Sequence, residues 1–303
     1  MKKIKKIDVH AHADPYYQSG PLYGGSPYVA SVKDLLSAYD RLNIEKGLLM
    51  PLVSPEFHWV QTTNGSCKEL AELYPDRFLW ACNVDPRSMG NDPHADLSVL
   101  LNHYKSLGAR SIGELTVNLY ADDLFVDNLF YHAAQCDLPV TIHVGTQIGK
   151  CYGIVDDLGL PRIEKMLKKH PDLKLIGHSQ PFWAELGTNV TEANRNRWPT
   201  GKVEEGRVAR LMREYPNLYC DLSAGSGCNA MTRDPEYTAK FVEEFSDRIL
   251  YGCDICQPAT EKHLERLDSF LDQMVEDGMI SEKSYYKIVR GNAIRLLKLE
   301  DME

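Results

Sequence analysis

The sequence predicts a single (β/α)8 TIM barrel that spans residues 1–303, an α/β fold, and three observations support that prediction. Short β-rich runs alternate eight times with longer runs of helical periodicity from Ile4 to Leu250 and beyond. No linker, low-complexity tract or break in composition interrupts the alternation. The length is also sufficient, because such a barrel commonly needs about 250 residues or more.

The first predicted strand ends in a His-x-His sequence, and two imidazoles side by side at a strand end can hold one metal ion. Side chains two apart on a strand point to the same side, so His10 and His12 should project together, with Asp8 below them. The residues expected to face the other way are Ile7, Val9 and Ala11. The seven further strands are predicted at residues 46–53, 78–84, 109–117, 139–145, 173–179, 218–223 and 248–254.

Segments with helical periodicity follow the strands, and prolines mark several of their ends. Pro161 and Pro235 suit the first turn of a helix, where a missing N–H does no harm. The predicted helices cover residues 31–42, 64–74, 92–107, 123–136, 161–170, 202–215, 235–245, 260–278 and 281–297. A doubly wound open sheet is the alternative fold, but it calls for a Gly-rich phosphate turn where this chain has His-Ala-His-Ala-Asp-Pro.

Charge and composition exclude several classes of partner. The chain has 34 basic and 43 acidic residues and a net charge of -9, which argues against nucleic acid. No apolar run reaches the length of a membrane span, and the start lacks an apolar signal region, so we expect a cytoplasmic protein. Eight irregularly spaced cysteines suit reduced thiols. Cys253 and Cys256 form a C-x-x-C, which we interpret as structural because a strand places them on opposite faces.

Side chains that can bind a metal stand at the predicted strand ends, where barrel active sites lie. They are His10, His12, Glu114, His143, His178 and Asp254. Each alone suits a core histidine or a helix cap, but four of only ten histidines would meet at one rim. Imidazole and carboxylate without thiolate suit zinc, manganese or iron(II). Asp254 could then accept a proton from bound water, and His178 could bind a second metal or stabilise an oxyanion.

These motifs together resemble the amidohydrolase superfamily, and more closely its amidohydrolase-2 branch, which includes aminocarboxymuconate-semialdehyde decarboxylase. The matching pieces are IDVHAH, IHVG, GHS, LYGCDICQP and GNAIRLLKL, in the family's order. The resemblance implies His10, His12, His143 and Asp254 as ligands of a first metal, with His178 as a second-metal ligand or a catalytic histidine. Glu114 stands where two-metal members often have a carboxylated lysine, so it either bridges two ions or completes a one-metal site.

The loops after the strands should shape the substrate pocket. Loop 54–61 carries Phe57, His58 and Trp59, and the long loop 180–201 is a candidate lid. Within that loop we predict Trp183 and Arg195 as substrate-binding residues, because aromatics and a guanidinium suit a small planar or carboxylated substrate. The alternative is that these aromatics pack the loop against the barrel or a partner subunit.

The leading hypothesis for function is a metal-dependent hydrolase of a small amide, ester or lactone, with metal-bound hydroxide as nucleophile and Asp254 as general base. The alternative is a metal-dependent, non-oxidative decarboxylase of a small aromatic or unsaturated carboxylic acid. A metal-binding barrel without catalysis is the third hypothesis. We expect one or two divalent ions, with Zn²⁺ favoured over Mn²⁺ or Fe²⁺. By analogy with the branch, which often forms dimers, we also expect a homodimer. The charge and the lack of a long apolar run predict a small-molecule substrate and no nucleic-acid or membrane partner.

Overall fold

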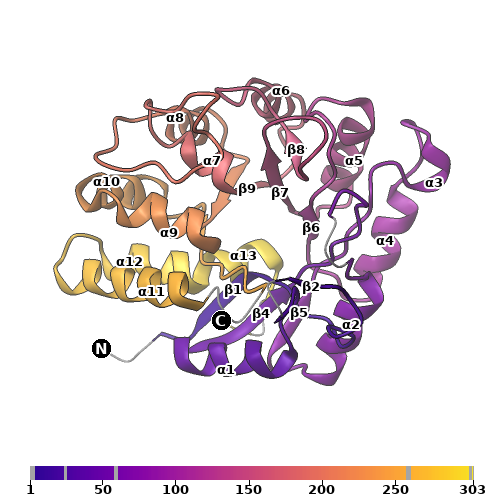
Figure 1. The fold of residues 1–303 in the computed structure, drawn as a ribbon, viewed down its shortest axis with the longest axis horizontal. Helices are drawn as coiled ribbons and strands as arrows, with labels where there is room; N and C mark the ends of the chain where they lie inside the picture. The colour runs from indigo at the N-terminus through magenta and orange to yellow at the C-terminus, as the bar shows by residue number, and fades with distance from the viewer. Residues whose placement is uncertain (1–3, 24–25, 58–60, 257–260, 300–301, 303) are drawn as a thin grey trace.

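Parallel strands form a ring at the centre of the computed structural model, which describes residues 4–23, 26–57, 61–256, 261–299 and 302 (Figure 1). Within those residues the ring contains eight strands. They are β1 (Lys6–Ala11), β4 (Ile44–Leu49), β5 (Phe78–Trp80), β6 (Ile112–Leu115), β7 (Val140–Gly145), β9 (Leu175–His178), β10 (Leu218–Asp221) and β11 (Ile249–Leu250). Short strands β2 (Leu22–Tyr23), β3 (Ser26–Pro27) and β8 (Ile154–Val155) lie outside the ring.

The ring is closed by two bridges between its two runs of paired strands. One run has the order β1-β4-β5, and the other has the order β11-β10-β9-β7-β6. A parallel bridge between Cys82 and Ile112 joins the chain after β5 to β6, and one between Ala11 and Ile255 joins β1 to the chain after β11. Because every strand is parallel and no edge is left open, the predicted (β/α)8 barrel is confirmed.

Helices surround the ring, and side-chain caps account for several of their starts. Ser31 caps the first helix by accepting from the N–H of Asp34, and Asp234 caps another by accepting from Tyr237. The helices near their predicted places are α1 (Val32–Leu42), α2 (Asn64–Leu73), α4 (Ser98–Ser106), α5 (Leu124–Gln135), α6 (Pro161–Lys169), α8 (Arg207–Glu214), α10 (Pro235–Phe245) and α11 (Glu261–Glu276). The predicted helix 281–297 is divided into α12 (Glu282–Tyr286), the π-helical turn η2 (Lys287–Gly291) and α13 (Asn292–Leu297).

Three helices were not predicted: α3 (Ser88–Asn91), α7 (Gln180–Ala184) and α9 (Ala224–Thr232). The sequence of α9, Ala-Gly-Ser-Gly-Cys-Asn-Ala-Met-Thr, contains weak helix formers, so tertiary packing decides its conformation. The segment 180–201, predicted as a loop, begins with α7, whose Phe182 and Trp183 are buried. Among the described residues, no helix has the length and apolar character needed to cross a membrane.

The barrel interior shows that one prediction about the first strand is wrong. Ile7 and Val9 pack inside the ring with Leu48, Leu250 and residues of α13. They therefore face the barrel interior and not the surrounding helices. Asp8 does not lie below the histidines, because its Oδ2 accepts from the Tyr39 hydroxyl of α1 at 2.6 Å. The cause is a register shift between Asp8 and Ala11, which breaks the simple alternation of the strand.

Candidate active site

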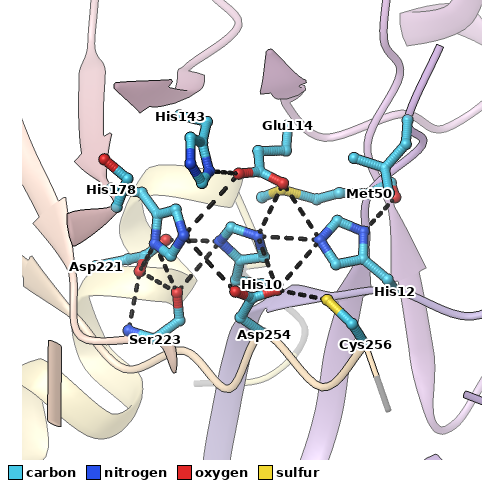
Figure 2. A network of polar contacts seen from close by, with 12 residues as sticks. His10, His12, Met50, Glu114, His143, His178, Asp221, Ser223, Asp254 and Cys256 are labelled. Carbon is cyan, nitrogen blue, oxygen red and sulfur yellow. Dashed lines mark hydrogen bonds and ion pairs between the residues drawn. The ribbon is translucent and has the colours of Figure 1, made fainter. Parts of the chain in front are cut away.

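The six side chains predicted at the strand ends meet at one rim of the barrel (Figure 2). We refer to His10, His12, Glu114, His143, His178 and Asp254 as the six-residue cluster. His10 and His12 lie at the end of β1, and Asp254 follows β11. The parallel sheet brings them together because all its strands end at the same rim. Asp254 has a φ of 53°, in the left-handed region that Asp tolerates better than most residues.

Three atoms in this cluster have the spacing of a metal site. The Nε2 atoms of His10 and His12 are 3.2 Å apart. Asp254 Oδ1 lies 3.7 Å from the first and 3.4 Å from the second. A tetrahedral zinc ion with bonds of about 2.0–2.1 Å places its ligand atoms about 3.3 Å apart. The donor types and their separations therefore fit a divalent cation held by these three residues.

Glu114 lies on the other side of the same histidines and forms a second possible group of ligands. Its Oε2 is 3.6 Å from His10 Nε2 and 3.4 Å from His12 Nε2. Together with His10 and His178 it makes a further set of three donors close enough to share an ion. His143 directs Nδ1 to Glu114 Oε1 at 2.7 Å and belongs to neither set. Its role as a metal ligand stays a prediction.

Hydrogen bonds behind the imidazoles direct their Nε2 atoms into the site. His12 Nδ1 lies 3.0 Å from the backbone oxygen of Met50, a pure acceptor, so this nitrogen must carry the proton. His10 Nδ1 lies 2.8 Å from Asp221 Oδ2, and His178 Nδ1 lies 3.1 Å from Asp221 Oδ1. This pattern matches the rule that a ligating histidine donates its other ring N–H to an oxygen acceptor.

The electrostatics of the cluster also suit a cation. Burial opposes ionisation of Glu114, but hydrogen bonds from His10, His12 and His143 hold its pKa well below the usual value. Burial likewise opposes ionisation of Asp254, and the charge on His10 with the hydrogen bond from His12 lowers its pKa. Burial disfavours the charged form of His12, yet Asp254 and Glu114 raise its pKa to about 9. The two carboxylates are thus held as anions, and the positive charge that balances them can come from protons or from a metal ion.

Asp221 is a site residue that the sequence reasoning missed. It ends β10, is fully buried, and contacts two members of the six-residue cluster. The signal was present, because the predicted strand 218–223 holds this carboxylate near its end. The nearby Ser223 hydroxyl contacts the Asp221 carboxylate and lies 2.9 Å from His178 Nδ1. Burial opposes ionisation of Asp221, but the charges on His178 and His10 lower its pKa.

Trp183 and Arg195 are not brought into the cluster. Trp183 is 2% exposed, and its indole N–H donates to the backbone oxygen of Asp221 at 3.0 Å. Arg195 is 1% exposed, and its Nη2 donates to the backbone oxygen of Asp157. These contacts pack the 180–201 segment onto the barrel, and a role for either residue in substrate binding stays a prediction. The other loop residues proposed to line the pocket, His58 and Trp59, lie outside the described residues.

An aromatic wall that includes Phe57 of the predicted pocket loop 54–61 borders His143. The Tyr152 ring centroid is 4.7 Å from that of His143 and 5.0 Å from that of Phe57. Phe57 also contacts Tyr28 at 5.5 Å between ring centroids.

Cys253 and Cys256, the C-x-x-C pair, are both free thiols. The Cys256 thiol donates to Asp254 Oδ1 at 3.0 Å, whereas Cys253 is fully buried, so the two thiols have different surroundings.

Comparison with known proteins identifies the family. The family model Amidohydro_2, described as amidohydrolase, matches residues 7–299. The chain belongs to the amidohydrolase family. Among curated proteins, none matches this amidohydrolase significantly.

Solved structures share the fold at low sequence identity. An uncharacterised TIM-barrel protein from Bordetella bronchiseptica is 18% identical, with a TM-score of 0.67 over 97% of this chain and 99% of its own. A probable 2-pyrone-4,6-dicarboxylic acid hydrolase from Acinetobacter baumannii is 14% identical, with a TM-score of 0.58 over 97% and 100%. The 5-carboxyvanillate decarboxylase from Novosphingobium aromaticivorans, complexed with manganese, is 18% identical, with a TM-score of 0.60 over 97% and 96%. The family indicates an enzyme of the amidohydrolase type.

Proposed function

We propose that this amidohydrolase is a metal-dependent hydrolase of a small amide, ester or lactone, with Asp254 as its general base. The observation that supports this most is the position of one carboxylate between three imidazoles. Asp254 Oδ1 faces His10 and His12, and Asp254 Oδ2 lies 3.7 Å from His178 Nε2. One carboxylate can therefore hold a cation through one oxygen and accept a proton through the other.

His10, His12 and Asp254 would hold the cation, with Glu114 as a further ligand. Nitrogen and oxygen donors at tetrahedral spacing favour zinc, while manganese and iron(II) also accept such ligands. When bound, the cation polarises the substrate carbonyl and makes a water molecule acidic enough to react near neutral pH. Glu114 contributes a second negative charge beside the same imidazoles, which leaves room for either one ion or two.

The chain's own residues then perform the proton transfers. Asp254 accepts a proton from the attacking water and returns it to the leaving nitrogen or oxygen as the acyl bond breaks. His178 directs Nε2 into the site, because Asp221 and Ser223 occupy the side of Nδ1. As an imidazolium, with Nδ1–H directed to Asp221, His178 would also carry a proton on Nε2, and that N–H would stabilise the oxyanion that develops on the carbonyl.

Decarboxylation of a small aromatic or unsaturated acid is the second candidate function. It is favoured by the aromatic wall of Tyr28, Phe57 and Tyr152, which suits a planar substrate. The shared fold with a 5-carboxyvanillate decarboxylase agrees with this candidate. In that reaction the bond to the carboxylate breaks, carbon dioxide leaves, and an acid such as Asp254 or His178 delivers a proton to the carbon that carried the carboxylate.

The two candidates are separated by their products. Zinc-loaded and manganese-loaded protein would be incubated with a panel of lactones, esters and amides, and with a matched panel of hydroxylated aromatic acids. Acid release from the first panel without carbon dioxide from the second supports hydrolysis. Carbon dioxide release with no hydrolysis would replace the proposal with the second candidate.

The variant Asp254→Asn tests the assigned base. We expect it to lose turnover while it keeps its far-UV circular dichroism spectrum, because a carboxamide cannot accept the proton. Asp156→Asn is the matched control, because Asp156 is a fully buried carboxylate outside the six-residue cluster that accepts from the backbone N–H groups of Arg162 and Ile163 at the start of α6. Near-wild-type turnover by Asp254→Asn would show that another group is the base.

A further inference from the structure

A single buried carboxylate contacts two histidines that belong to different parts of the proposed mechanism (Figure 2). Asp221 Oδ2 lies 2.8 Å from His10 Nδ1, and Asp221 Oδ1 lies 3.1 Å from His178 Nδ1. The carboxylate is 0% exposed, as is His10, while His178 is 1% exposed. Water therefore has little access to these contacts. The Ser223 hydroxyl also lies near both rings, 2.9 Å from His178 Nδ1 and 3.3 Å from His10 Nδ1.

The chemistry of a carboxylate determines which ring nitrogen carries the proton. An ionised carboxylate offers only acceptors, so each Nδ1 that it contacts must be a donor. We propose that Asp221 is a positioning residue that fixes protonated Nδ1 on both His10 and His178, so that one side chain controls metal binding and the catalytic histidine together. This inference rests on the proposed function, because it takes His10 as a metal ligand and His178 as a catalytic side chain.

The surroundings of Asp221 are built to hold its two oxygens in place. The backbone N–H of Ser223 donates to Oδ1 at 2.9 Å, and the Ser223 hydroxyl reaches the same oxygen. The Trp183 indole donates to the backbone oxygen of Asp221 at 3.0 Å, which fixes the main chain at the end of β10. A buried Trp183 therefore acts on the site through Asp221, although it does not face the six-residue cluster.

Gly252 provides the space that lets the strands approach at this point. A Cβ on Gly252 would lie 2.9 Å from Ser223 Cβ and 3.3 Å from His10 Cβ. It would also lie 3.7 Å from Asp221 Cγ. The close approach of β1, β10 and the chain after β11 therefore requires that Gly252 have no side chain. The contact between Asp221 and the two histidines is thus supported from three segments that are far apart in the sequence.

Histidine NMR is the direct test. Protein labelled with ¹⁵N-histidine would be recorded by long-range ¹H–¹⁵N correlation, both without metal and with zinc, and His178 would be assigned with His178→Asn. We expect Nδ1 to carry a proton on both His10 and His178 in the wild-type protein. An unprotonated Nδ1 on either ring would overturn the inference, and this result needs no active substrate.

Asp221→Asn then separates the two contacts, because a carboxamide has one acceptor oxygen and a donor NH₂ group. The carboxamide oxygen should stay at the Oδ1 position, because it accepts there from the Ser223 backbone N–H. The NH₂ group then faces His10 Nδ1, so His10 should move its proton to Nε2. Zinc affinity, measured by competition with a chelator, should fall about 10–100-fold because a partner behind a ligand is altered. Ser223→Ala should keep protonated Nδ1 on both rings and lose less zinc affinity, because Asp221 remains.

Asp156→Asn is again the control, and it should bind zinc as the wild-type protein does. Unchanged zinc affinity and unchanged ring protonation in Asp221→Asn would refute the inference. If that variant does not fold, the wild-type spectra and Ser223→Ala still decide it. A wild-type protein that shows both protonated Nδ1 atoms but hydrolyses no substrate would refute the proposed function and leave this inference standing.

Discussion

Replacing Tyr39 with phenylalanine tests how the first strand is held against the helix layer. Tyr39 and Asp8 are both 0% exposed, and the phenol donates to Asp8 Oδ2 at 2.6 Å. The other oxygen of Asp8 accepts from the backbone N–H groups of His10 and Cys253, each at 2.9 Å. Tyr39→Phe therefore leaves one oxygen of a buried carboxylate without its donor while the ring stays in place.

The expected cost follows from the charge and burial of the acceptor. A hydrogen bond to a charged group contributes about 1.5–3 kcal/mol, and an unsatisfied buried acceptor costs about 1–3 kcal/mol. We expect Tyr39→Phe to lower the free energy of unfolding by about 2 kcal/mol, because the packing of the ring itself is unchanged. Little space is available for a water molecule to replace the hydroxyl, because the Tyr39 oxygen packs closely against Gly47. A Cβ added to Gly47 would lie only 1.8 Å from that oxygen.

Urea unfolding followed by tryptophan fluorescence and circular dichroism measures the effect. Tyr131→Phe is the control, because this tyrosine is 51% exposed, so the loss of its hydroxyl should change stability by less than about 0.5 kcal/mol. A Tyr39→Phe protein as stable as the control would refute the argument that Asp8 depends on this donor.

The remaining predictions concern packing, pH and metal. Gly177→Ala should destabilise the fold by about 1–3 kcal/mol in urea unfolding, because its Cβ would lie 2.2 Å from the buried Phe182 ring. Gly65→Ala is the control and should not destabilise the fold, because its Cβ would meet nothing closer than 3.5 Å. Hydrogen bonds from two lysines lower the pKa of Asp137 from 3.8 to about 2, so this group stabilises the fold above pH 3.8 and loses that contribution as the pH falls through about 2. Asp137→Asn should cost under about 1 kcal/mol at pH 7, because the pair is half exposed, and the difference should vanish near pH 2 in acid unfolding. Removal of bound metal by a chelator should lower the Tm measured by calorimetry, and added zinc should restore it, because a bound ion stabilises only the folded state. A Tm that neither chelator nor zinc changes would contradict the metal site.

The order of strands and the rim residues could be predicted from the sequence because both depend on local signals. Eight alternating segments predicted the closed ring, and the strands were found near their expected places. His10, Glu114, His178 and Asp254 could be predicted to converge because parallel strands in a barrel all end at one rim. Convergence at the rim depends only on the position of each residue in its strand, and the sequence pattern determines that position.

Tertiary structure alone decided which partner each side chain finds. A register shift turned Asp8 toward Tyr39, although strict alternation placed it below His10. Asp221 reaches His10 across 211 positions of the chain, and no local pattern encodes that contact. The contact between the Trp183 indole and the backbone oxygen of Asp221 likewise joins residues that no local pattern links. A strand's periodicity determines its faces, but the hydrogen bonds at its end depend on which neighbouring strands the closed barrel places beside it.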